Sequence, residues 1–582
     1  MSVQDHRFYR PPPSSVRQGR PITSTVSPWL RWASEAVWFV EHAFERARAD
    51  AKPEEDTRVR IVVIQAVFIG IFVLLAAGAT RAALLGPGGG IGSATVAGAL
   101  QRADLTDRNG ALLATNIVHY GLYIDPTEVW DREAAFTQIR RALPQVSSTR
   151  LRRVLDGERR LIVQPGLTPA ERQAVHALAL GGLSFEPEDR RVYPLGTSAA
   201  HLLGTADTGG QGVSGVELAF NDAIRAAGAQ GQDFALSLDL RIQGVLENEL
   251  AAAADEAGAK GAVGVVADAT TGEILGMASW PTYDPNDRGS APEGAALNRV
   301  TSAHYEMGSV FKTFTVAAAL DTGRADLDTM IDASEAYYIG NRRISDFHAT
   351  NKILSLEDVF IHSSNIGTSR LAVEMGADTM RDYFQRLGLL DAAPIELKES
   401  ARPRRPRQWD DSTRASLSFG YGIMITPLQM TAATVALVNG GVYRPLTLRR
   451  GGTAAEGRRI VTAETSAAIR QLMRANVVRG SGRSANAEGL RVGGKTGSAN
   501  KLVDGRYDAR HGVGSFASVF PADGPDDARR YVVFVLVDEP SQGSRLGGTV
   551  AAPVVGRVID RIAGFLGVQR RIDPPAPPEP AA

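Results

Sequence analysis

The strongest constraint on this chain is an uncharged stretch of 20 residues, 61–80, bounded by Arg60 and Arg81. At about 1.5 Å per residue, a helix of this length spans about 30 Å, the hydrocarbon thickness of a bilayer. Five Lys or Arg residues lie in the 15 positions before the stretch, whereas the 15 positions from 81 onward contain Arg81 alone. The positive-inside rule therefore places the N-terminus in the cytoplasm and the bulk of the chain outside.

The segments around this stretch admit more than one interpretation. Ala77-Gly78-Ala79 fits a signal-peptidase site, but the 60 residues before the apolar run are too many for a cleaved leader, which favours a retained anchor. Residues 29–49 alternate aromatic and charged side chains. They fit an amphipathic helix on a membrane or a partner, or a partly ordered tail beside the membrane.

The remaining sequence divides into two regions by its pattern. Residues from about 100 to 235 mix short strands, turns and helices without nucleophile–base or metal-ligand spacing, which predicts a pedestal domain. Beyond residue 239, two β-rich runs precede a helical middle and three follow it; these runs are 262–268, 273–279, 492–500, 514–520 and 531–538. One antiparallel sheet assembled from both ends would give an α+β fold and bring the strand of Lys495 beside the helix of Ser309.

These patterns predict five segments. We expect a cytoplasmic tail at 1–60, a transmembrane helix at 61–80, the pedestal at 81–235, the larger domain at 236–568 and a Pro-rich flexible tail at 569–582. The predicted helices of the larger domain include 311–320, 357–362 and 426–438.

The basic residues are mostly arginine and rarely lysine. Of the 64 Lys and Arg residues only seven are lysine. A buried lysine can lose its proton whereas arginine stays charged, so a lysine inside a motif is a candidate base. The 64 acidic residues balance the basic ones, which gives no indication of nucleic acid binding. The absence of cysteine excludes disulfides and cysteine-ligated metals.

Ser309 and Lys312 form the first candidate constellation. Gly308 ends a loop, and the helix formers that follow place Ser309 at a helix N-terminus with Lys312 one turn later on the same face. A serine hydroxyl becomes a strong nucleophile when a base takes its proton. Lys312 can be that base if burial and the helix dipole lower its pKa from about 10.4. Taken alone, the motif fits a serine cap beside a solvated lysine better.

A second motif, Ser363 and Asn365, lies between two predicted helices, where a loop can hold a hydroxyl and an amide over a cleft. A second match to the Ser-x-x-Lys motif is excluded as a catalytic pair by strand geometry. Ser498 and Lys501 also match Ser-x-x-Lys, but residues three apart on a strand face opposite sides.

The third motif is Lys495-Thr496-Gly497-Ser498, on one of the late strands. Thr496 and Ser498 project from the same face of that strand, and Gly497 lets a ligand or another backbone approach closely. Together with Lys495, the two hydroxyls suit a substrate that carries a carboxylate and lies along the strand edge.

In this order the three motifs resemble those of the penicillin-recognising serine enzymes. Their surroundings narrow the resemblance to the class B penicillin-binding proteins, over roughly residues 100–560. Within class B, the late hairpin and Gly547–Val554 are most similar to the cell-division (septal) transpeptidase. Ser498 stands where many members carry threonine, so the hydroxyl is kept. The other segments that carry the resemblance are Ser237–Gln243, Tyr305–Lys312, Phe419–Gln429, Asp538–Pro540, Asp107–Gly110 and Arg190–Glu217.

The resemblance implies acyl transfer on peptidoglycan stem peptides without a metal, a nucleotide or another cofactor. Ser309 would attack the penultimate D-alanine with Lys312 as its base, and β-lactams would trap Ser309 by mimicking the donor. Ser363 would relay a proton to the leaving amine, and Asn365 would orient Lys312 and the substrate amide. The amine of a neighbouring peptide would then resolve the acyl-enzyme into a cross-link.

The resemblance also implies the binding groups and the location. Backbone N–H groups of Ser309 and Ser498 would hold the oxyanion, and Lys495, Thr496 and Ser498 would bind the terminal carboxylate. The protein would be a single-pass protein of the bacterial inner membrane with its catalytic domain in the periplasm. A peptidoglycan glycosyltransferase and other membrane proteins of the division machinery would be its partners.

Four other functions share parts of this pattern. The elongation-specific class B transpeptidase is the closest rival, and the sequence separates it only moderately. A β-lactam sensor would carry several transmembrane helices, whereas this chain has one apolar stretch. A non-catalytic division scaffold would be indicated by the loss of Ser309 or Lys312, and both are present. A class A β-lactamase needs Glu-x-x-x-Asn after Ser363, and residues 396–400 lack the asparagine.

Overall fold

The computed structural model describes residues 64–76, 102–452, 456–525 and 528–571. The described residues belong to two units, with 64–76 in the first and 102–571 in the second. In the first unit, residues 64–76 are helical and their large apolar side chains are exposed. Within the described ranges, no helix combines the length and the apolarity needed to cross a bilayer. The rest of the predicted segment 61–80, the predicted amphipathic segment 29–49 and most of the tail 569–582 lie outside the described residues.

The second unit begins with a five-stranded sheet organised around a long strand, β2. β2 pairs antiparallel with β1, β3 and β4, and β1 pairs parallel with β5. Three helices pack with β2 and β3 in a common apolar core. The strands are β1 (Leu105–Thr106), β2 (Leu112–Ile124), β3 (Leu161–Leu167), β4 (Leu183–Val192) and β5 (Phe234–Ala235), and the helices are α3 (Arg132–Ala142), α4 (Ser148–Leu155) and α5 (Pro169–His176).

The short helices α6 (Ala200–Leu203), α7 (Gly215–Ala219) and α8 (Asn221–Ala229) follow this sheet in sequence. A buried charge cluster joins the sheet to α7 and α8. Glu217, on α7, accepts hydrogen bonds from Arg102 Nε and Arg191 Nε, both at 2.7 Å. Because Glu217 and both guanidinium groups are buried, replacing Glu217 would leave two positive charges uncompensated, which costs about 3–5 kcal/mol. The cluster therefore depends on Glu217, and the apolar side chains around it, such as Leu105 and Val216, belong to one core.

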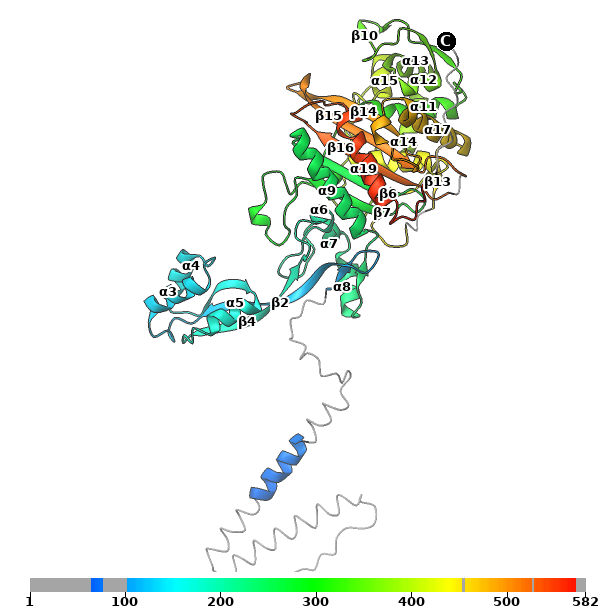
Figure 1. The fold of residues 1–582 in the computed structure, drawn as a ribbon. Coiled ribbons are helices and arrows are strands. Elements are labelled where there is room, and N and C mark those ends of the chain that lie inside the picture. Colours follow the sequence, from blue (N-terminus) through cyan, green and yellow to red (C-terminus); the bar gives the residue numbers. More distant parts are fainter. Residues whose placement is uncertain (1–63, 77–101, 453–455, 526–527, 572–582) are drawn as a thin grey trace, which may run out of the picture. The chain divides into compact units, whose positions relative to one another are not determined.

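The larger part of the unit is built on a second five-stranded sheet in the order β14-β15-β16-β6-β7, with every pair antiparallel. Two of its strands precede the helical middle in sequence and three follow it, which confirms the predicted closure from both ends (Figure 1). β14 is an edge strand, so one side of its backbone is open. The strands are β6 (Gly261–Asp268), β7 (Ile274–Trp280), β14 (Gly493–Val503), β15 (Arg506–Phe520) and β16 (Tyr531–Asp538).

Helices cover both faces of this sheet. Alternate residues of the strands face two separate cores: Val266 and Val533 pack with α9 (Leu240–Ala257) and α19 (Ala552–Ile562), whereas Val265 and Phe534 pack with α16 (Pro427–Val438). Beyond α16 lies a helical layer whose central helix, α11 (Lys312–Asp321), is buried over Lys312–Ala319. Its other helices are α12 (Leu356–Ile361), α13 (Asn365–Met375), α14 (Ala377–Arg386), α15 (Asp411–Ser418) and α17 (Ala463–Arg479).

Candidate active site

Ser309 lies where the helical layer meets the edge strand. It belongs to a 3₁₀ turn, Gly308–Phe311, that runs directly into α11. Gly308 has a φ of +58°, and a Cβ on it would lie 2.3 Å from Ser498 O. A Cβ on Gly497 would lie 2.3 Å from Met307 O. The turn therefore rests on β14 with no side chain between the backbones, as predicted for the strand of Lys495 and the helix of Ser309.

Ser363 connects two buried lysines. It lies between the end of α12 and the start of α13 and has a φ of +58°, which is uncommon for a residue with a Cβ. Lys312 Nζ donates hydrogen bonds to Ser363 Oγ at 3.1 Å and to the carbonyl oxygen of Ser363. Lys495 Nζ donates to the same hydroxyl at 3.1 Å. Both lysines are fully buried, so Ser363 Oγ is a shared acceptor beneath the nucleophile turn.

The electrostatics of this arrangement favour neutral amines. Burial lowers the pKa of Lys495 to about 7. The pKa of Lys312 lies well below its usual value, first because of burial and second because of the nearby charge of Lys495. The carboxylate of Asp346 acts on Lys312 in the opposite direction. Because burial and the charge of Lys495 both lower the pKa of Lys312, whereas burial alone lowers that of Lys495, we take Lys312 to be the amine that loses its proton first.

A cavity of about 630 Å³ opens above these groups and is lined by Ser309, Ser363, Asn365, Thr496 and Ser498, among others. Thr496 and Ser498 therefore face the same space, as their alternation on the strand predicts. The Thr496 hydroxyl lies 2.7 Å from Ser481 Oγ, and Ser498 Oγ accepts a hydrogen bond from Gly547 N at 3.0 Å. Hydroxyls and amides thus line the side of the cavity formed by β14.

Two predicted pairs, Ser309 with Lys312 and Asn365 with Lys312, form no hydrogen bond within the described residues. Lys312 Nζ contacts Ser363, and Ser309 Oγ makes no hydrogen bond within the described residues. Asn365 Nδ2 donates to Ser345 O at 3.0 Å, and no hydrogen bond joins Asn365 to Lys312 in the part of the chain that the structure describes. Catalytic hydrogen bonds are often long before substrate binds, so the roles of Ser309, Lys312 and Asn365 stay predictions.

Asp346 is a site residue that the sequence did not indicate. Its Oδ2 accepts from Ser364 Oγ at 2.7 Å and its Oδ1 from Ile366 N at 3.0 Å, so it holds the first turn of α13 next to Ser363. Ser364 is itself the cap of that helix, accepting from Gly367 N. A lone Asp 17 positions before the Ser363 motif carries no pattern that a single sequence can reveal.

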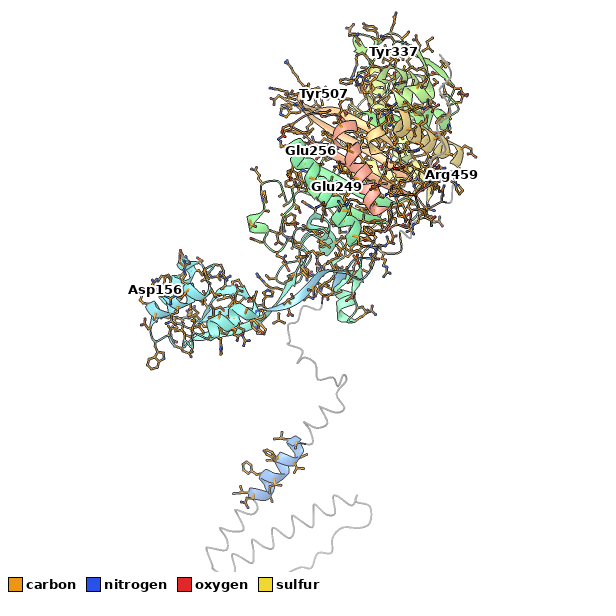
Figure 2. The ribbon with its side chains drawn as sticks, in the orientation of Figure 1. Asp156, Glu249, Glu256, Tyr337, Arg459 and Tyr507 are labelled. Atoms are coloured by element: carbon orange, nitrogen blue, oxygen red, sulfur yellow. The ribbon has the colours of Figure 1, made fainter. Side chains whose placement is uncertain are left out.

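Glu306 is a second such residue, three positions before Ser309. It is buried and accepts from Gly422 N at 2.7 Å and from the Tyr507 hydroxyl at 3.0 Å. Burial raises the pKa of Glu306, against the effect of these two hydrogen bonds. Figure 2 shows Tyr507 at the hairpin of β14 and β15, so Glu306 ties the nucleophile turn to that hairpin. The partners lie 116 and 201 positions away, which puts them beyond local sequence reasoning.

The described residues contain no candidate metal-binding site. Across the described ranges, no group of three or more His, Asp or Glu residues could hold a metal ion.

Comparisons with known proteins identify relatives of this chain. The family model described as penicillin binding protein transpeptidase domain matches residues 262–560, and that of the penicillin-binding protein dimerisation domain matches residues 99–233. The chain is 51% identical over 563 residues to the probable peptidoglycan D,D-transpeptidase FtsI of Caulobacter vibrioides, covering 94% of this chain and 95% of that protein. It is 30% identical to the peptidoglycan D,D-transpeptidase FtsI of Escherichia coli K12, covering 80% of this chain and 84% of that protein. A crystal structure of penicillin binding protein 3 from Mycobacterium tuberculosis, complexed with aztreonam, superimposes with a TM-score of 0.63 at 25% identity and covers 81% of this chain and 97% of that chain.

Proposed function

Because this chain belongs to the penicillin-binding proteins that carry a transpeptidase domain, we propose that it is a peptidoglycan D,D-transpeptidase of the division septum. It cross-links stem peptides through a serine acyl-enzyme and is inhibited by β-lactams. The observation that carries the proposal is the shared hydrogen bonding of Lys312 and Lys495 to Ser363 beneath the turn of Ser309. The septal role rests on the relatives named FtsI.

In this mechanism Ser309 Oγ attacks the carbonyl carbon of the penultimate D-alanine, and neutral Lys312 takes the hydroxyl proton. The lowered pKa of Lys312 supports this role, since a base must be unprotonated at working pH. The proton then passes through Ser363 Oγ, which both lysines reach, to the nitrogen of the departing D-alanine. The amine of a second stem peptide attacks the acyl-enzyme by the reverse sequence, forming the cross-link and releasing Ser309.

The edge strand supplies the binding groups. Because one side of the β14 backbone is open, an extended donor peptide can lie along it, with backbone N–H groups of Ser309 and Ser498 at the oxyanion. Lys495, Thr496 and Ser498 bind the terminal carboxylate, for which a charged Lys495 amine is the natural partner. Gly497 leaves room for the turn of Ser309 against this strand. Asn365, which lines the cavity, orients the substrate amide.

We also propose that residues 61–80 anchor the protein in the bacterial inner membrane, with the catalytic domain in the periplasm. The helical residues 64–76 expose large apolar side chains such as Phe68 and Phe72, which supports burial of this segment in lipid. A peptidoglycan glycosyltransferase and other division proteins of the same membrane would be its partners.

The nucleophile is tested with Ser309→Ala. This variant should lose covalent labelling by a fluorescent penicillin while it keeps the circular dichroism spectrum and Tm of the wild type. Undiminished labelling would show that another residue is acylated. Depletion in cells tests the role: filaments support septal function, whereas round cells would assign the protein to elongation.

A further inference from the structure

Arg545 is the single Lys or Arg among the described residues that line the active-site cavity, and no Asp or Glu lines it. Its Nε donates to Pro540 O at 3.2 Å and its Nη1 donates to Ala509 O. Within the described residues it forms no ion pair, so its Nη2 group is left for a ligand. A guanidinium that is fixed by two carbonyl oxygens and faces a cavity without carboxylates is suited to bind an anion there.

The position of Arg545 is fixed relative to the edge strand. Two residues after it, Gly547 N donates to Ser498 Oγ, and a Cβ on Gly547 would lie 2.3 Å from Gly497 O. The contact of Arg545 with Ala509 places the guanidinium beside the bulge where β15 faces Asn500 and Lys501. Arg545 therefore lies two or three residues farther along β14 than Ser498, which is roughly 7–10 Å at about 3.3 Å per residue.

This spacing relates Arg545 to the donor peptide. A donor with its terminal carboxylate at Lys495, Thr496 and Ser498 would lie extended along the open edge of β14. At the same rise per residue, Arg545 would face the residue two or three positions before the donor's C-terminus. We infer that Arg545 binds a second carboxylate of the donor stem peptide, carried by that upstream residue. Arg545 is thus a specificity-determining residue for acidic over neutral or basic stem peptides, an inference that rests on the proposed transpeptidase function.

The first test uses two β-lactams that differ by one group. Carbenicillin is benzylpenicillin with an added carboxylate on its acylamino side chain, so the ratio of their second-order acylation rate constants isolates the second carboxylate. Arg545→Gln should lower the carbenicillin-to-benzylpenicillin ratio about tenfold, the size of one charge-assisted hydrogen bond. Arg545→Lys should recover part of that ratio because it keeps the charge. Raising the salt concentration should reduce the preference of the wild type.

A matched control separates local binding from general charge. Arg506 lies on the β14–β15 hairpin that Arg545 contacts through Ala509, is exposed and does not line the cavity. Arg506→Gln removes the same charge and should leave the ratio at the wild-type value. A ratio that falls equally in both variants would assign the effect to long-range electrostatics and overturn the inference.

A second arm tests the peptide itself. Donor pentapeptides ending in D-Ala-D-Ala, with either diaminopimelate or lysine at the third position, differ by one carboxylate. The full chain should release D-alanine faster from the diaminopimelate peptide, and Arg545→Gln should remove that preference.

The outcomes distinguish the inference from the function on which it rests. The inference is overturned if Arg545→Gln keeps both wild-type preferences. It is also overturned if the acylation rate constants of both penicillins fall equally, because such a loss reports on the ring carboxylate that both penicillins share or on the segment that carries Arg545. In these cases acylation of Ser309 by benzylpenicillin still stands. If benzylpenicillin does not acylate the wild type at Ser309, the proposed function fails and the inference fails with it.

Discussion

Replacing Lys495 with arginine should change the pH dependence of acylation and not only its rate. Burial lowers the pKa of Lys495 to about 7, and the pKa of Lys312 also lies well below its usual value. The proposed mechanism needs Lys312 neutral and Lys495 charged. The second-order rate constant for acylation should therefore rise with pH as Lys312 loses its proton and fall as Lys495 does, which gives a bell-shaped profile for the free enzyme.

The size of the alkaline decline follows from the pKa of Lys495. With a pKa of about 7, the charged fraction is about one half at pH 7 and about one hundredth at pH 9. Acylation by the wild type should therefore decline by up to tenfold per pH unit on this limb. Arginine keeps its proton across this range, so Lys495→Arg should lose the alkaline decline and keep the acidic limb that reports Lys312.

The measurement is the rate constant for benzylpenicillin acylation, by stopped flow, from about pH 5.5 to about pH 9.5. Lys501→Arg is the matched control, because Lys501 is paired with Asp538 and Glu539 and does not line the active-site cavity. It should keep the bell of the wild type. An alkaline limb that persists in Lys495→Arg with an unchanged pKa would refute the assignment of that limb to Lys495.

Three further substitutions test the geometry. Ser363→Ala removes the hydroxyl that both lysines share and should slow acylation by about 10²–10⁴, measured by stopped flow; a smaller loss would exclude a proton relay. Gly308→Ala places a Cβ 2.3 Å from Ser498 O at a φ of +58°, so both Tm and penicillin labelling should fall by more than a surface Gly→Ala control causes. Asp346→Asn removes a charge that raises the pKa of Lys312, so the acidic limb should move to lower pH, and an unmoved limb would contradict this coupling.

Much of the fold could be predicted because it depends on periodic patterns. The β-rich runs and the helices of the larger domain start and end within a few residues of the observed elements, except that β15 begins at Arg506 rather than near 514. The missing half of β15 belongs to the hairpin with β14, whose polar and charged residues, such as Asp508 and Arg510, give no strand signal. A register shift after Asn500 accommodates this segment, and only the paired backbone reveals it.

The candidate site could be predicted where it consists of short motifs and not where it depends on long-range contacts. Ser309, Ser363 and Thr496 meet at one cavity as the sequence indicated. Ser481, which contacts Thr496, and Arg545, which lines the same cavity, belong to no motif. Their positions follow from the packing of α17 and of the segment after β16 against β14, and a single sequence contains no pattern for such packing.

Whether a lysine in this chain can act as a base depends on the groups around its amine, because these groups set its pKa. Lys501 is largely enclosed too, but although burial lowers its pKa, the carboxylates of Asp538 and Glu539 raise it above the usual value. Lys312 and Lys495 have no carboxylate within hydrogen-bond distance among the described residues, and their pKa values fall. The choice of lysine over arginine is therefore not the signal of a base by itself. A lowered lysine pKa is indicated where the buried amine donates to a hydroxyl and not to an acid, because no carboxylate there stabilises the charged form.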